Sequence, residues 1–93
     1  MSVTLVVPTL LRPVTSGAAR VEVEGATVAE VIAAVDAVHP GFAAAVLERD
    51  GTLKRFLSIW VGDDDVRYLR GAATPVPDGS EVVVLPAVAG GGR

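Results

Sequence analysis

The stretch TVAEVIAAVDAVHPG, residues 27–41, predicts the one long helix of the chain. Thr27 followed three residues later by Glu30 is a capping box, in which each side chain can bond a backbone N–H at the helix start. Apolar residues then recur at helical spacing and form a single stripe, at Val28, Val31, Ile32, Val35 and Val38. His39, Pro40 and Gly41 stop the pattern. We therefore expect an amphipathic helix over 28–38.

Strand patterns flank this helix on both sides. Before it, segments 2–7 and 20–24 alternate apolar and polar residues and predict two strands, joined through a loop over 9–19 as a wide hairpin. After it, a short helical turn over 42–51 is followed by strands at 54–62 and 66–69, with turns at 63–65 and 75–80. Segment 81–86 is apolar without alternation, which is typical of a central strand that is covered on both sides or lies beside a docking surface.

The order strand, strand, helix, strand, strand, strand predicts an α+β domain of two layers. One long amphipathic helix covers one face of a mixed four- to five-stranded sheet. A right-handed crossover through the helix places later strands beside the first. We expect this domain over residues 1–86 and a flexible glycine-rich tail over 87–93.

Composition limits the chain to a single small domain and excludes several function classes. It has 93 residues, 51% of them apolar, and no cysteine, so neither a disulfide framework nor a thiol nucleophile exists. The net charge is −3 and the basic residues are scattered along the sequence, which argues against nucleic acid as a partner. The opening 13 residues carry two prolines and no basic leader, so we expect neither a signal peptide nor a membrane span, and a cytoplasmic protein.

No catalytic or metal-binding constellation stands out. His39 is the only histidine and precedes Pro40 at a helix end, where a capping role fits better than acid–base chemistry. Asp63, Asp64 and Asp65 lack the ligand spacing of a calcium loop, and a solvated turn is the better interpretation. The three C-terminal glycines are followed by neither Lys-Ser/Thr nor a helix, so they are not a phosphate loop.

The face of the sheet opposite the helix is a candidate docking surface. Strand alternation places Leu57, Ile59 and Val61 toward the core and leaves an apolar group on the other side, at Val6, Phe56, Trp60, Val83 and Leu85. A contiguous apolar cluster on a small domain usually marks a partner site. The alternative is that segment 42–48 or the 9–19 loop folds over these residues.

The sequence LPAVAGGGR, residues 85–93, is a candidate functional tail. Fully extended, residues 87–93 reach about 23 Å beyond the last strand. Three glycines leave the backbone without side chains, so it could thread a slot too narrow for any Cβ. The alternative is a frayed end with no role.

The chain resembles the ubiquitin-like β-grasp sulfur carriers of the ThiS and MoaD families, and within them the CysO branch. The resemblance is carried by VTLVVPTLLRP (3–13), RFLSIWVGDDDVRYLRG (55–71) and DGSEVVVLPAVAGG (78–91). It implies a protein that is not an enzyme and binds no cofactor. An E1-like partner would use ATP to adenylate the C-terminal glycine, sulfide or a persulfide would convert it to a thiocarboxylate, and a biosynthetic enzyme would accept the sulfur.

The resemblance places the reacting carboxylate on Gly91, with Gly90 as the penultimate glycine. Gly92 and Arg93 exceed the family pattern. Either a protease such as a JAMM-type metallopeptidase trims the chain to Gly91, or it removes Arg93 alone and exposes Gly92, or the two residues are not native. Two other functions stay open: a β-grasp binding subunit that is never acylated, and a ubiquitin-like protein modifier. Cysteine, thiamine, molybdopterin and other thio-products all draw on such carriers, so the receiving pathway stays open too.

Overall fold

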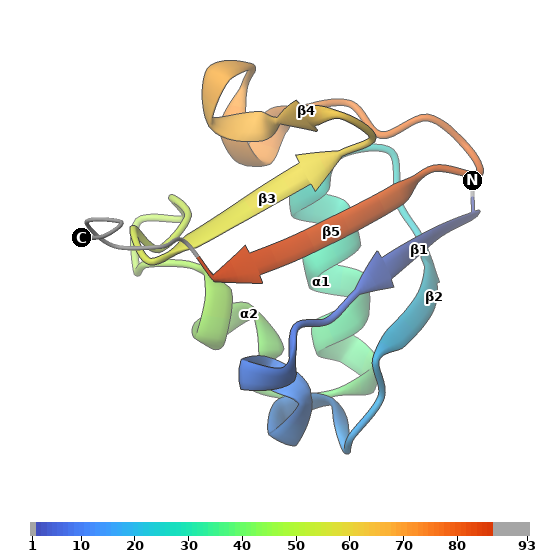
Figure 1. Ribbon diagram of the computed structural model, residues 1–93, viewed down its shortest axis with the longest axis vertical. Helices are drawn as coiled ribbons and strands as arrows, with labels where there is room; N and C mark the ends of the chain where they lie inside the picture. Colours follow the sequence, from blue (N-terminus) through green and yellow to red (C-terminus); the bar gives the residue numbers. More distant parts are fainter. Residues whose placement is uncertain (1, 87–93) are drawn as a thin grey trace.

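The computed structural model describes residues 2–86, which form a five-stranded mixed sheet with the strand order β2-β1-β5-β3-β4. The strands are β1 (Ser2–Val6), β2 (Arg20–Glu24), β3 (Leu57–Val61), β4 (Asp64–Asp65) and β5 (Glu81–Pro86). β1 and β5 run parallel, and the other neighbours are antiparallel. The helix α1 (Val28–Val38) lies behind the sheet in Figure 1. The predicted α+β class and the position of the last strand beside the first are confirmed.

The capping box forms at the start of α1, with one difference from the expected pairing. The Thr27 hydroxyl accepts a hydrogen bond from the Glu30 backbone N–H at 3.2 Å. The Glu30 carboxylate reaches back to the backbone N–H of Ala26 at 2.9 Å, one residue before the cap. Both contacts satisfy donors that would otherwise lack a partner at the helix start.

Four of the five residues of the apolar stripe of α1 are buried, namely Val28, Val31, Ile32 and Val35. The fifth, Val38, is 62% exposed, so its assignment to the core stripe was wrong. Val38 is the last residue of α1, directly before the capping residue His39. The carboxylate of Asp36 then accepts from the backbone N–H groups of Gly41 and Ala43, both at 3.0 Å, and joins α1 to the short helix α2 (Phe42–Val46).

One hydrophobic core lies between the sheet and the helices. Phe42, the largest fully buried side chain, enters it from α2, and Leu11 enters from the 3-10 helix η1 (Thr9–Thr15). Segment 9–19, expected as a loop, therefore contains a short helix. Both segments pack toward the core and α1, so the alternative in which either covers the opposite sheet face is wrong.

The region after β3 differs most from the sequence prediction. β3 begins at Leu57 and not at residue 54, and β5 alternates, with Val82 and Val84 buried. The expected turn at 63–65 contains β4, and the expected strand at 66–69 is instead the 3-10 helix η2 (Val66–Tyr68), which is followed by η3 (Gly71–Ala73). The Asp65 carboxylate caps η2 by accepting from the Arg67 backbone N–H at 2.9 Å, which favours a helical turn over an extended chain.

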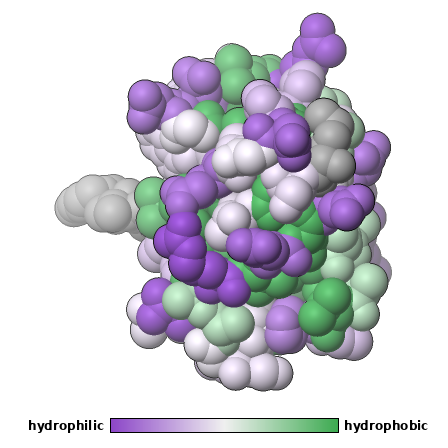
Figure 2. Space-filling model, turned by 90° about the vertical axis from the view of Figure 1, so that its right-hand side faces the viewer, coloured by the Kyte–Doolittle hydropathy of each residue, from purple (hydrophilic) through white to green (hydrophobic). Residues whose placement is uncertain are grey.

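The edge strand β2 carries charges along its exposed side. Arg20, Glu22 and Glu24 are exposed, while Val21 is buried against the core. Figure 2 shows hydrophilic residues spread across this side of the molecule. Charged residues on an edge strand oppose pairing with another chain.

Candidate functional site

The tail starts from a central position in the sheet. β5 lies between β1 and β3, and its last residue, Pro86, pairs with Leu57 at the start of β3. The predicted reactive residues Gly90, Gly91 and Gly92, together with Arg93, lie outside the described residues. The structure therefore defines the position of Pro86, the last described residue, and the chemistry predicted for the tail remains a prediction.

Three of the predicted docking residues form one row across the outer sheet face, the face opposite α1. Val83 on β5 pairs with Val6 on β1 on one side and with Trp60 on β3 on the other. All three are half-buried, whereas their neighbours Leu5, Val82 and Ile59 point into the core and are fully buried. The alternation used to assign the two faces is correct for these strands.

The row continues toward the tail root, the place where β5 ends. Leu85 lies two residues beyond Val83, is 44% exposed and pairs with Ser58 on β3. The Ser58 hydroxyl accepts a hydrogen bond from the Trp60 indole N–H at 3.1 Å, which orients the ring along the strand. Val6, Trp60, Val83 and Leu85 together are called the outer apolar row below.

Phe56 does not belong to this row. It precedes β3, in the turn in which the Leu57 N–H bonds to the Lys54 carbonyl, and it is 50% exposed. The Lys54 ammonium lies 5.9 Å from the centre of its ring, within the range of a cation–π contact. The strand expected over 54–62 begins only at Leu57, so Phe56 lies in the turn just before β3, and its role in docking stays a prediction.

A polar pair borders the outer apolar row. Arg20 on β2 and Glu81 on β5 form a salt bridge that spans β1 from one neighbouring strand to the other. Their side chains are 58% and 50% exposed, so this pair contributes little to stability. It marks the boundary of the apolar surface on the side away from the tail root.

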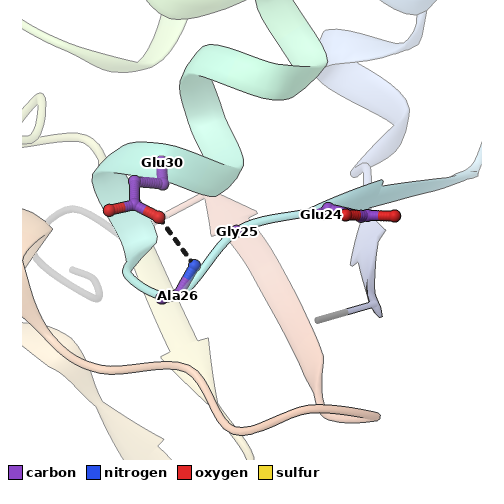
Figure 3. Close-up of a pocket in the computed structure, with 4 residues that line it drawn as sticks. All are labelled: Glu24, Gly25, Ala26 and Glu30. Atoms are coloured by element: carbon purple, nitrogen blue, oxygen red, sulfur yellow. Dashed lines mark hydrogen bonds between the residues drawn. The ribbon is translucent and has the colours of Figure 1, made fainter.

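The described residues hold no second chemical site. The hollow between β2 and α1 is lined by Glu24, Gly25, Ala26 and Glu30, but Glu30 serves the helix cap and the two carboxylates do not point toward one another (Figure 3). No group of histidine and acidic side chains within residues 2–86 is arranged to hold a metal ion. Asp64 and Asp65 instead pair with β3, and His39 caps α1, as expected for a structural role.

Sequence reasoning missed one grouping. The basic residues that are scattered along the chain meet in space near the tail root, where Arg49, Lys54, Arg55 and Arg67 surround the start of β3. The adjacent Lys54 and Arg55 were a weak local signal. The approach of Arg67, whose guanidinium donates to the Leu57 carbonyl at 2.6 Å, depends on the fold of the later segment.

No helix within the described part of the chain is long and apolar enough to span a bilayer.

Comparison with known proteins gives consistent matches. The model of the ThiS family matches residues 5–91. Sulfur carrier protein CysO of Mycobacterium tuberculosis is 43% identical over 93 residues, which cover 98% of this chain and 100% of that protein. A chain of the crystal structure of the Amycolatopsis orientalis BexX/CysO complex matches with a TM-score of 0.88 and 43% identity, covering 95% of this chain and 98% of that one.

A more distant relative carries a different name. Small archaeal modifier protein 3 of Haloferax volcanii is 37% identical over 68 residues, which cover 73% of each chain.

The crystal structure of Mycobacterium tuberculosis CysO matches with a TM-score of 0.88 and 41% identity, covering 92% of this chain and 99% of that one. The expected ubiquitin-like β-grasp fold is confirmed.

Proposed function

The chain belongs to the ThiS family, and from this premise we propose that it is a sulfur carrier that works through its C-terminal glycine carboxylate. An E1-like enzyme binds ATP. An oxygen of the carrier's C-terminal carboxylate attacks the α-phosphorus of this ATP, so that pyrophosphate leaves and an acyl adenylate forms. Hydrosulfide then attacks the acyl carbon and AMP leaves. The resulting thiocarboxylate donates its sulfur to a biosynthetic enzyme, and the carrier itself binds no cofactor.

The observation that carries this proposal is the similarity to CysO along almost the whole chain. The family match ends at residue 91, which supports Gly91 as the acylated residue and Gly90 as its neighbour. Gly92 and Arg93 lie beyond it, so we propose that a protease, for which a JAMM-type metallopeptidase is the candidate, removes them. A bulky Arg93 would oppose entry of the tail into a narrow adenylation site.

The fold supports presentation of the tail by a rigid body. β5 pairs with β1 over residues 81–83 and with β3 over residues 82–86, so its last residue, Pro86, is held by β3. We propose that the outer apolar row docks on the activating enzyme, because a half-buried row of apolar side chains beside the tail root would fix the direction in which the tail enters. The BexX/CysO complex supports the idea that such carriers assemble with a partner protein.

Intact-protein mass tests the proposed chemistry. The chain ending at Gly91 is incubated with ATP, sulfide and the activating enzyme of its own host, and its mass should rise by about 16 Da as oxygen is replaced by sulfur. The full chain ending at Arg93 and a chain ending at Pro86 are the matched controls, and neither should change. A Gly91-ended chain whose mass stays constant, while the enzyme adenylates another substrate, would overturn the proposal.

Two alternatives predict other products from the same mixture. A protein modifier, which the name of the Haloferax volcanii relative favours, would form isopeptide bonds with lysines of other proteins and give conjugates of higher mass. A binding subunit that is never acylated would associate with its partner without any change in mass. Denaturing electrophoresis and mass measurement on one sample separate the three outcomes.

A further inference from the structure

The charges of the described domain are segregated along the direction of β3 and β5. The basic end, which surrounds the tail root, is formed by Arg49, Lys54, Arg55 and Arg67. Leu57 pairs with Pro86 at the tail root. The Leu57 N–H donates to the Lys54 carbonyl, and the Arg67 guanidinium donates to the Leu57 carbonyl. Arg49 and Lys54 line one shallow hollow on the hairpin over 47–54. Figure 1 shows this connection beside the tip of β5.

The four cations of the basic end form no salt bridge with the described residues. Arg49, Arg55 and Arg67 are exposed. The acidic residues nearby are Glu48 and Asp50. Asp50 is held at the hairpin tip by the Thr52 hydroxyl at 2.7 Å and the Thr52 N–H at 3.0 Å, and these hydrogen bonds lower the pKa of its carboxyl. The basic end therefore has an excess of positive charge on a protein whose net charge is negative.

The opposite end of the same strands is acidic. Ser2 pairs with Glu24 and donates its N–H to Asp78, and Asp64 pairs with Val61. The Gly62 N–H bonds to the carbonyl of Glu81, whose carboxylate is paired with Arg20. Glu81 and Pro86 are the two ends of β5, separated by about 17 Å at the usual rise of a strand. This separation exceeds the Debye length of about 8 Å at physiological ionic strength, so a partner at one end responds mainly to the charges of that end.

We propose that the basic end is a recognition surface for an acidic rim on the enzyme that activates the tail, and that it orients the carrier tail-first during encounter. The proposal rests on the proposed carrier function and adds a partner chemistry to it. Opposite charges attract the tail-root end toward the acidic rim, while the acidic end is repelled from it. Phe56, half-exposed among these cations, adds an apolar contact at the centre of the surface.

Two charge reversals of equal size test the orientation. Arg55→Glu changes the basic end. Arg70→Glu makes the same change in net charge elsewhere, because Arg70 and Thr74 flank η3 and the Thr74 carbonyl accepts a hydrogen bond from the Val28 N–H at the start of α1. Both side chains are exposed and make no interaction with residues 2–86, so both variants should keep the wild-type unfolding midpoint. The measurement is kcat/KM for conversion of the Gly91-ended carrier to the thiocarboxylate, at low and at high salt.

Arg55→Glu should lower kcat/KM about fourfold at low salt, because reversing one charge about 10 Å from one acidic group of the partner costs roughly a factor of four. The loss should shrink at high salt, with kcat at saturating carrier unchanged. Arg70→Glu should leave kcat/KM at or above the wild-type value. Equal effects of the two reversals, in a carrier that is still converted, would overturn the inference and leave the carrier function intact.

A second measurement needs no partner. The relaxation enhancement of each amide proton is measured with an anionic nitroxide and with its neutral analogue, and the ratio of the two is taken. This ratio should be larger at residues 54–57 than at residues 62–65 and 78–81, because the anionic probe concentrates where the potential is positive. A uniform ratio would overturn the inference. The inference would also be overturned if the wild-type carrier self-associates and Arg55→Glu abolishes this self-association. The basic end would then bind the acidic end of a second copy. Failure of the wild-type carrier to gain sulfur overturns the proposed function and this inference together.

Discussion

Adjacent residues on β3 provide a matched test of which sheet face is core and which is docking surface. Ile59→Ala removes a side chain that is 0% exposed and pairs with the fully buried Val84. Truncation of a buried isoleucine leaves a cavity and costs about 3 kcal/mol of unfolding free energy. For a domain of this size that corresponds to a fall in Tm of about 12 to 24 °C.

Trp60→Ala, one residue along, should behave in the opposite way. Trp60 is half-buried on the outer face and loses mainly its contact with Val83 and the hydrogen bond to Ser58, so the free energy of unfolding should fall by only about 1 kcal/mol. If the outer apolar row docks on the activating enzyme, loss of a central aromatic costs about 2 kcal/mol of binding, or roughly 30-fold in kcat/KM. Alanine is preferred to aspartate because Trp60 pairs with Asp65, and a second carboxylate there would add repulsion.

Thermal unfolding followed by circular dichroism and the thiocarboxylate assay are measured for both variants, the assay well below the Tm of Ile59→Ala. We expect Ile59→Ala to lose stability but, where folded, to keep its kcat/KM, and Trp60→Ala to show the reverse. A Trp60→Ala variant that unfolds as early as Ile59→Ala would refute the assignment of the two faces. Wild-type kcat/KM in a stable Trp60→Ala would refute docking through this row.

Two further predictions concern the start of α1. Thr27→Ala removes the hydroxyl that accepts a hydrogen bond from the Glu30 N–H, so the unfolding free energy measured by urea titration should fall by about 1 kcal/mol. Thr27→Ser keeps a hydroxyl and should retain most of this free energy. Equal losses in the two variants would mean that the cap is not the cause. Gly25→Ala places a Cβ 2.9 Å from the backbone nitrogen of Val31 and 3.1 Å from the carbonyl carbon of Glu30, so α1 must shift, at a cost of about 1 to 3 kcal/mol; an unchanged urea midpoint would show that this approach is not tight.

The sequence by itself determined the elements whose signals are local. The capping box at Thr27 and Glu30 and the helical spacing from Val28 to Val35 defined α1, whose bounds match the prediction, and the alternation in 20–24 did the same for β2. The resemblance carried by segments such as 78–91 identified the family and the β-grasp fold. The predictions of α1 and β2 succeeded because periodicity and capping depend on residues that are close together in the sequence.

Only the tertiary structure decided the features that depend on distant segments. Segment 66–69 has the composition of a strand, yet it forms the 3-10 helix η2, with Val66 buried in the core beside residues from distant segments. The outer apolar row became a row only when the parallel pairing of β1 with β5 brought Val6 beside Val83. Arg67 reaches the start of β3 from ten residues further along the chain. Charge acts through space, so a basic end can be assembled from residues that appear scattered in the sequence.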